Sequence, residues 1–123
     1  MIKVVGFLKR KPGMSVAAFR DYYESTHRLI GERVLAGYAC HYARRFLDGY
    51  SDAADAPFGV EGDYDVIMEI WYPSEAAYAA AQRHLSSPDI RAEIVADEEK
   101  LFDRPRNRFF TLVESVSELP PVA

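Results

Sequence analysis

Apolar and polar positions divide the first third of the chain into a strand-like and a helix-like segment. Residues 2–9 are rich in Val, Ile and Phe, which is typical of a strand, and a Pro-Gly pair follows as a turn. From Val16 to Leu35, apolar residues recur every three or four positions, which predicts an amphipathic helix. Ser15 and Gly37 are suited to begin and end it. Its expected inward stripe comprises Val16, Phe19, Tyr23, His27, Ile30 and Val34.

The rest of the chain predicts three more strands and a second helical region. Residues 38–47 alternate in polarity, 64–72 are strongly apolar, and 107–116 are again strand-like. A helical region is expected to begin after Ser74, to break at Ser86-Ser87-Pro88 and to continue over 89–103. The order β-α-β-β-α-β predicts an α+β, ferredoxin-like fold, with a four-stranded antiparallel sheet and helices on one face. We expect one domain over 1–116 and a C-terminal tail over 117–123.

Composition narrows the class of protein. The 123 residues suit one domain, and the net charge of −4 with a pI near 5.3 disfavours nucleic acid as a partner. An RNA-binding module shares the element order, but residues 64–72 (YDVIMEIWY) lack its basic and aromatic signature. The single cysteine excludes an intramolecular disulfide. No apolar stretch is long enough for a membrane span or a signal peptide, so the expected location is cytoplasmic.

The connection over residues 48–63 is long and acidic. It contains Gly, Pro and Ser, five acidic residues and no basic one. Connections of this length are uncommon in compact domains and are either functional or disordered. We therefore expect a mobile hairpin extension or, alternatively, a lid or a dimer contact.

The predicted strand at 64–72 is apolar on both faces, which indicates a partner. One face would carry Tyr64, Val66, Met68, Ile70 and Tyr72, and the other Asp65, Ile67, Glu69 and Trp71. A sheet covered by helices on one face normally turns a polar face to water. An apolar second face instead marks an interface, and the simplest partner is a second copy of the chain. We therefore predict a homodimer.

Three segments in order resemble the EthD family of the dimeric α/β-barrel superfamily. They are VVGFLKRKPGMSVAAFRDYYESTH, with its Phe-x-x-Tyr-Tyr-x-x-x-His run, then YDVIMEIWYPS, then ADEEKLFDRPRNRFFTLVES. The resemblance implies a compact homodimer with a small-molecule pocket between the sheet and the helices of each subunit. Such relatives include aromatic polyketide dehydratases and cyclases, a lactone methylisomerase, and proteins linked to ether degradation. Similar superfamily neighbours include cofactor-independent quinol oxygenases.

Three residues are the catalytic candidates. His27 lies on the inward stripe, and an imidazole exchanges protons near neutral pH, so it could act as a general base or be a buried structural histidine. Glu69 could orient the ring of His27, or could instead bind backbone or Arg44. Tyr42 could donate to a substrate oxygen. His41 points to the opposite face of the strand, so at most one of the two joins His27, and we favour Tyr42.

Four further residues are candidates for binding a substrate. Tyr23 lies on the stripe of His27, Trp71 could form an aromatic wall or fill the core, and Asp65 shares the strand face of Glu69. Asp97 follows Ile94 by three positions, on an inward stripe that competes with one through Val95 and Phe102. No metal is expected, because the histidines have no ligand spacing, and no cofactor, because no Gly-rich phosphate loop occurs.

The function predicted from these observations is a cofactor-free lyase or isomerase, of the dehydratase or cyclase type. It would act on an aromatic or lactone-like metabolite, with a histidine as general base. Two alternatives stay open: a non-enzymatic accessory or binding dimer with the same pocket, and a cofactor-independent monooxygenase of the same superfamily.

Overall fold

A computed structural model describes residues 1–49 and 62–123, so most of the long acidic connection, and its expected role as lid or dimer contact, lies outside the described residues. The elements, in chain order, are β1 (Ile2–Leu8), α1 (Val16–Tyr22), η1 (Tyr23–His27), α2 (Arg28–Leu35), β2 (His41–Phe46), β3 (Val66–Tyr72), α3 (Glu75–Leu85), α4 (Pro88–Leu101), η2 (Arg104–Arg106) and β4 (Arg108–Thr111). This order confirms the predicted β-α-β-β-α-β arrangement.

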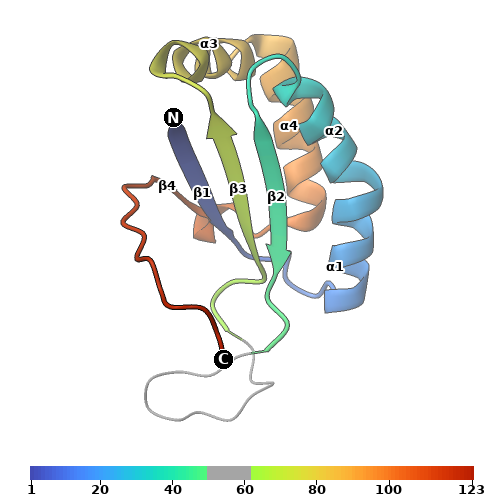
Figure 1. The fold of residues 1–123 in the computed structure, drawn as a ribbon. Helices are drawn as coiled ribbons and strands as arrows, with labels where there is room; N and C mark the ends of the chain where they lie inside the picture. Colours follow the sequence, from blue (N-terminus) through green and yellow to red (C-terminus); the bar gives the residue numbers. More distant parts are fainter. Residues whose placement is uncertain (50–61) are drawn as a thin grey trace.

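The four strands form one antiparallel sheet with the order β2-β3-β1-β4. Figure 1 views this sheet from the face that the helices leave open, with α4 behind it and α1 and α2 along the β2 side. The α+β, ferredoxin-like fold with helices on one face is therefore confirmed. Throughout, the open face is called the outer face of the sheet.

Local signals set the ends of the helices as predicted. The hydroxyls of Ser15 and Ser74 accept the backbone N–H groups of Ala18 and Ala77 at the starts of α1 and α3. Gly37, two residues beyond α2, adopts a φ of 85°, which a residue with a side chain rarely does. The break at Ser86-Ser87 separates α3 from α4, and α4 begins at Pro88 because proline needs no N–H bond there.

The first helical segment differs from the expected uninterrupted helix. Residues Tyr23–His27 form a π-helical turn between α1 and α2. Such turns insert extra residues into an α-helix and occur frequently at functional sites. Val16 also does not belong to the buried stripe, because it is the first residue of α1 and remains 41% exposed.

All four strands are shorter than predicted. β1 ends at Leu8 rather than residue 9, and β3 begins at Val66 rather than residue 64. β2 begins at His41 rather than residue 38, since residues 36–38 form the turn that follows α2. β4 ends at Thr111 rather than at residue 116. After a last backbone bond from Leu112 to Lys3, residues 113–123 have no regular structure.

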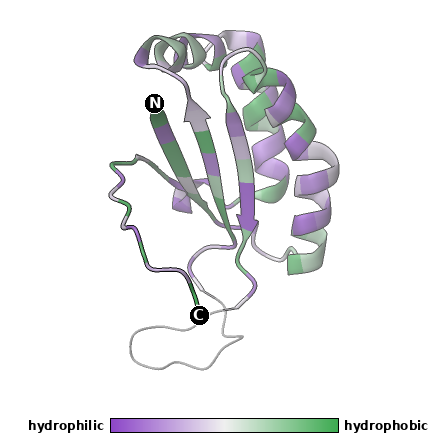
Figure 2. Cartoon of the chain, viewed as in Figure 1, coloured by the Kyte–Doolittle hydropathy of each residue, from purple (hydrophilic) through white to green (hydrophobic). Residues whose placement is uncertain are grey.

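The core comprises two apolar clusters between the sheet and the helices. One contains Leu8, Phe19, Tyr23, Val66, Met68, Leu101 and Phe102, and the other Val34, Leu35, Tyr72 and Ala81. Tyr42 and Ile70 pack against both clusters. Figure 2 shows the hydrophobic positions recurring along the central strands. Within the described residues, no helix is both long and apolar enough to cross a bilayer.

Candidate functional site

A pocket of about 190 Å³ lies where the two core clusters meet, between the sheet and the helices. It is lined by Leu8, Tyr23, His27, Ile30, Gly31, Val34, Leu35, Tyr42, Met68, Ile70, Leu85, Ile94, Glu98, Phe102 and Phe109. Most of these side chains are apolar, and the polar groups are those of Tyr23, His27, Tyr42 and Glu98. Small-molecule sites combine an apolar lining with a few polar groups in this way.

His27 is held in one orientation at the wall of this pocket. Its Nδ1 atom lies 2.7 Å from Oδ2 of Asp97, which is only 5% exposed. The rings of Tyr23 and Phe102 meet the imidazole edge to face, at centroid distances of 5.1 and 5.4 Å. A neutral imidazole that donates from Nδ1 to a carboxylate keeps the lone pair of Nε2. The arrangement therefore prepares Nε2 to accept a proton.

Asp97 holds a second group besides His27. It also accepts a hydrogen bond from the hydroxyl of Tyr22. Burial and this bond to Asp97 raise the pKa of Tyr22 to about 12, so the phenol stays protonated and keeps donating. Two donors thus converge on one buried carboxylate, as buried charge requires. The predicted inward register through Ile94 and Leu101 placed Asp97 on the correct face of α4, although its carboxylate binds His27 rather than lining the pocket.

The hydroxyl of Tyr42 lies against α2 at Gly31. A Cβ atom at residue 31 would stand 2.8 Å from the Tyr42 hydroxyl oxygen, closer than such atoms normally approach. Burial is the main cause that raises the pKa of both Tyr23 and Tyr42, and each phenol also affects the pKa of the other. Both phenols therefore keep their protons at neutral pH, and the Tyr42 hydroxyl can donate to a group in the pocket.

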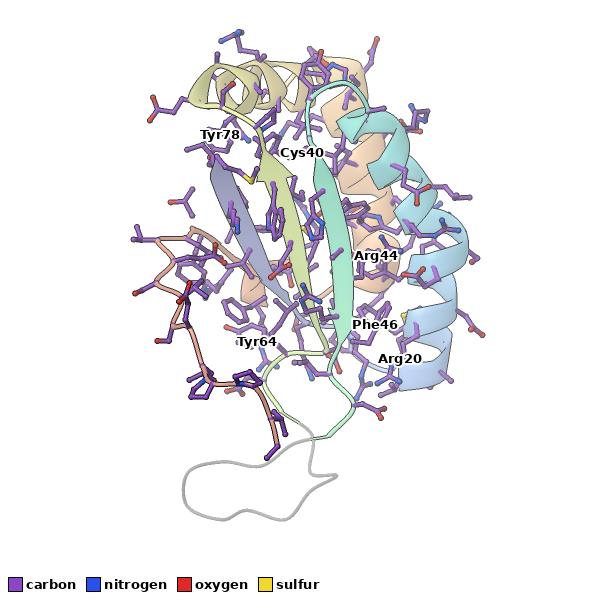
Figure 3. All side chains as sticks on the ribbon, in the orientation of Figure 1. Arg20, Cys40, Arg44, Phe46, Tyr64 and Tyr78 are labelled. Atoms are coloured by element: carbon purple, nitrogen blue, oxygen red, sulfur yellow. The ribbon has the colours of Figure 1, made fainter. Side chains whose placement is uncertain are left out.

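Arg44 supports the two tyrosines from the same face of β2. Arg44 and Phe46 extend from β2 toward the first helical segment (Figure 3). The guanidinium of Arg44 binds Glu24 through bonds of 2.9 and 3.0 Å and lies 4.9 Å from the centre of the Tyr42 ring. Arg44 lowers the pKa of Glu24 and favours negative charge on Tyr42. The positive charge of Arg44 thus lies next to the ring of Tyr42, the predicted hydrogen-bond donor.

Glu98 lines the pocket but was not among the residues predicted from the sequence. Burial raises the pKa of its carboxyl, against the opposing effects of Arg104 and His27. The nearest Arg104 nitrogen is 3.7 Å away, so this cation offsets burial only in part. The signal was present in the sequence, because Glu98 lies four residues from both Ile94 and Phe102, which also line the pocket. A carboxyl with a raised pKa is suited to giving and taking a proton.

Two predicted site residues lie outside the pocket, on the outer face of the sheet. Glu69 binds Arg45 at 2.7 Å, and Trp71 stacks on His41 at a centroid distance of 3.9 Å. The prediction that Glu69 orients the ring of His27 is therefore wrong, because it is Asp97 that binds His27 Nδ1. The reason is strand alternation: Met68 and Ile70 face the helices, so Glu69 and Trp71 face away.

Asp65 is likewise not brought to the pocket. It lies just before β3, where it binds the backbone N–H of Arg10 at 2.9 Å and the ammonium of Lys9 at 3.3 Å. Asp65 therefore joins the end of β1 to the start of β3. Of the seven predicted residues, Tyr23, His27 and Tyr42 line one pocket, and Asp97 contacts it through His27. In residues 1–49 and 62–123, no three His, Cys, Asp or Glu side chains gather as a metal site requires.

Comparison with known proteins agrees with this architecture. The sequence model of the EthD domain matches residues 11–105. The chain belongs to the EthD family. An EthD-family protein from Bacillus halodurans has a similar structure, with 15% identity, a TM-score of 0.63, and coverage of 94% of this chain and 99% of its own. In sequence, no protein with a curated description matches the present chain.

Two further structures show how widely the fold is shared. A dimeric ferredoxin-like protein of unknown function from Thermobifida fusca has 15% identity and a TM-score of 0.53, over 92% of this chain and 90% of its own. An antibiotic biosynthesis monooxygenase has 13% identity and a TM-score of 0.51, over 94% and 100%. At these identities the likeness extends to the fold alone.

Proposed function

We propose that this EthD-family protein is a cofactor-independent lyase or isomerase that acts on a small aromatic or lactone-like metabolite in the helix–sheet pocket. The observation that carries the proposal is the bond of 2.7 Å between His27 Nδ1 and buried Asp97, at the wall of an apolar pocket. A volume of about 190 Å³ is below the roughly 300–1,000 Å³ of drug-sized sites, which favours one or two rings.

The first step is removal of a proton next to a carbonyl group. The substrate C–H proton passes to Nε2 of His27, and its electron pair moves onto the carbonyl oxygen as an enolate. Asp97 stabilises the imidazolium that forms, as a carboxylate does in other histidine-based sites. The hydroxyl of Tyr42 donates to the enolate oxygen, and the guanidinium of Arg44, 4.9 Å from the centre of the Tyr42 ring, stabilises the negative charge that Tyr42 acquires.

The fate of the enolate decides the type of reaction. If a hydroxyl group stands on the adjacent carbon, the electron pair returns to expel it, and a proton from Glu98 or His27 completes a water molecule. If no leaving group is present and a double bond is conjugated with the enolate, the proton returns to the far carbon of the conjugated system and the product is an isomer. Both outcomes need an acid and a base in one pocket, which Glu98 and His27 supply.

The homodimer is part of the same proposal. The outer face, which the helices leave open (Figure 1), carries the half-buried side chains of Phe7, Ile67 and Trp71 and that of Phe110, which is 50% exposed. Exposed apolar sheet faces mark interfaces. The Thermobifida fusca neighbour is described as dimeric, which supports a dimer for this chain as well.

Exchange of carbon-bound hydrogen tests the base directly. Candidate lactones, phenols, quinols and small aromatic acids are incubated in D₂O with the wild type, His27→Ala and His41→Ala. His41 is the matched control, because it lies on the outer face. We expect enzyme-dependent deuterium incorporation or product formation in the wild type and His41→Ala, and loss of about a hundredfold or more in His27→Ala.

Other outcomes separate the alternatives. Oxygen consumption with a quinol would indicate the monooxygenase, in which His27 deprotonates a phenol and the electron-rich anion reacts with O₂. Binding without exchange, turnover or oxygen uptake would indicate an accessory dimer. Equal exchange rates in the wild type and His27→Ala would refute the assignment of the base.

A further inference from the structure

The pocket crosses the sheet on its inner face, the face that carries the helices. Each strand contributes at least one lining side chain, such as Tyr42 from β2, Ile70 from β3, Leu8 from β1 and Phe109 from β4. The edge strands are β2 and β4. With neighbouring strands about 4.8 Å apart, these two edges are separated by roughly 14 Å. The pocket is therefore a slot that runs from one edge of the sheet toward the other.

The two ends of this slot differ in chemistry. Tyr42 lies at the β2 end, and the helical segment that contains His27 runs along the β2 side of the sheet (Figure 1). At the β4 end, the lining residue of the strand is Phe109, whose ring has no polar group. The proposed proton transfer therefore takes place at the β2 end, and the β4 end contacts a part of the substrate that does not react.

Phe109 lies at the boundary between the slot and solvent. It is 55% exposed although it lines the pocket, whereas Met68, which lines the pocket from β3, is 8% exposed. Figure 1 shows the helices gathered behind the sheet and along its β2 side, with β4 at the opposite edge. The exposure of Phe109 therefore locates an opening of the slot beside β4.

A glycine lets the ring of Phe109 lie over the sheet at this opening. Gly6 of β1 pairs with Phe109 on one side and with Met68 on the other. A Cβ atom at residue 6 would stand 3.0 Å from Cε1 of Phe109 and 3.0 Å from the methyl carbon of Met68, closer than such atoms normally approach. The Phe109 ring thus occupies the space that a side chain at residue 6 would fill, and it narrows the slot between β1 and β4.

We propose that Phe109 is the end wall of the slot and determines the length of the substrate. Molecules of one or two fused rings fit between this wall and the β2 end, and molecules of three fused rings do not. The volume of about 190 Å³ agrees with that limit, because it lies below the roughly 300–1,000 Å³ of drug-sized sites. This inference rests on the proposed function, because it takes the slot as the substrate site. Phe109 determines specificity and takes no part in proton transfer.

Flat phenols of increasing length measure the slot. Phenol, β-naphthol and β-anthrol contain one, two and three fused rings, and burial of apolar area alone would make the longest bind most tightly. We expect the wild type to bind β-anthrol about tenfold or more weakly than β-naphthol, and Phe109→Ala to reverse that order. Fluorescence titration of the full chain gives these two dissociation constants, and competition with β-naphthol gives that of phenol.

Two further variants separate the wall from a general loss of stability. Phe110→Ala is the matched control, because Phe110 is the next residue of β4 and contacts Phe7 on the outer face, and it should keep the wild-type order. Phe109→Trp enlarges the wall, so it should weaken β-naphthol by about tenfold and leave phenol nearly unchanged. Each comparison is made between ligands of one protein, so a stability change common to all ligands cancels.

The outcomes distinguish the wall from the reaction. An unchanged order in Phe109→Ala, or a wild type that prefers β-anthrol to β-naphthol, would overturn the end wall. A wild type that binds none of the three phenols would also overturn it, because no apolar slot would then be open beside β4. Length selection as expected, together with equal hydrogen exchange in the wild type and His27→Ala, would refute the proposed base and leave the wall standing.

Discussion

At the residue scale, the central feature is a histidine whose two ring nitrogens have different surroundings. Nδ1 of His27 is bound to Asp97, whereas the ring itself lines the pocket. Asp97 does not line the pocket, so its role toward the reaction is that of a positioning residue. Its hydrogen bond fixes the ring of His27 and favours the tautomer with hydrogen on Nδ1.

Replacement of Asp97 tests this positioning. In Asp97→Asn the amide offers both a donor and an acceptor, so the tautomer with hydrogen on Nδ1 loses its preference. We expect ¹⁵N spectra of the histidine rings to show His27 moving toward the Nε2–H tautomer, and any turnover to fall by about a hundredfold. Glu99→Gln, on the exposed side of the same helix, is the control and should change neither readout.

Gly31 makes the position of Tyr42 testable without touching the tyrosine. Alanine normally stabilises a helix by about 1 kcal/mol relative to glycine. At residue 31 its Cβ would lie 2.8 Å from the Tyr42 hydroxyl oxygen, so Gly31→Ala should instead lower thermal stability and ligand affinity. The double variant Gly31→Ala/Tyr42→Phe removes that oxygen and should recover part of the stability. A stabilised Gly31→Ala protein with unchanged affinity would contradict the placement of Tyr42.

Glu98 predicts a pH dependence of stability. Its pKa in the folded protein is raised above 4.5 by burial, so the folded state holds the proton more tightly than the unfolded chain does. The contribution of Glu98 to stability is therefore present below pH 4.5 and is lost as the pH rises through the raised pKa. Glu98→Gln escapes this loss. The melting temperature of Glu98→Gln minus that of the wild type should therefore be larger at pH 7 than at pH 4, which calorimetry can measure.

At the scale of elements, helix positions were predicted well because their signals are local. Ser15, Ser74 and Pro88 act within one helical turn, and the structure places all three at helix starts. The π-helical turn over Tyr23–His27 was not predicted. Tyr23 and His27 are four positions apart, and this spacing fits an α-helix equally well. Only packing against the sheet decides between these two forms.

The two serine caps should each contribute measurably. Ser15→Ala and Ser74→Ala leave the N–H groups of Ala18 and Ala77 without their acceptors. Each should lower the free energy of unfolding by about 1 kcal/mol in urea titrations. Ser25→Ala, in an exposed position that caps no helix, is the comparison, and a change of equal size there would argue against the caps.

At the scale of the whole molecule, the fold followed from strand and helix periodicity, whereas the membership of the site followed only in part. Both faces of β3 carry large apolar residues, so its pattern could not show that Glu69 and Trp71 face away from the pocket. The partner of His27 comes from α4, 70 residues further along the chain. No local pattern links residues so far apart, and the competing stripes of α4 concealed Glu98.

The most direct test of the central claim is ligand-induced stabilisation of three proteins: wild type, His27→Ala and His41→Ala. Each is screened by thermal shift against lactones, quinols, phenols and small aromatic acids. A ligand at about 100 times its dissociation constant adds roughly 2.7 kcal/mol of stability. We predict a ligand that stabilises the wild type and His41→Ala strongly and His27→Ala much less. Equal stabilisation of all three proteins would place the ligand away from His27 and contradict the account.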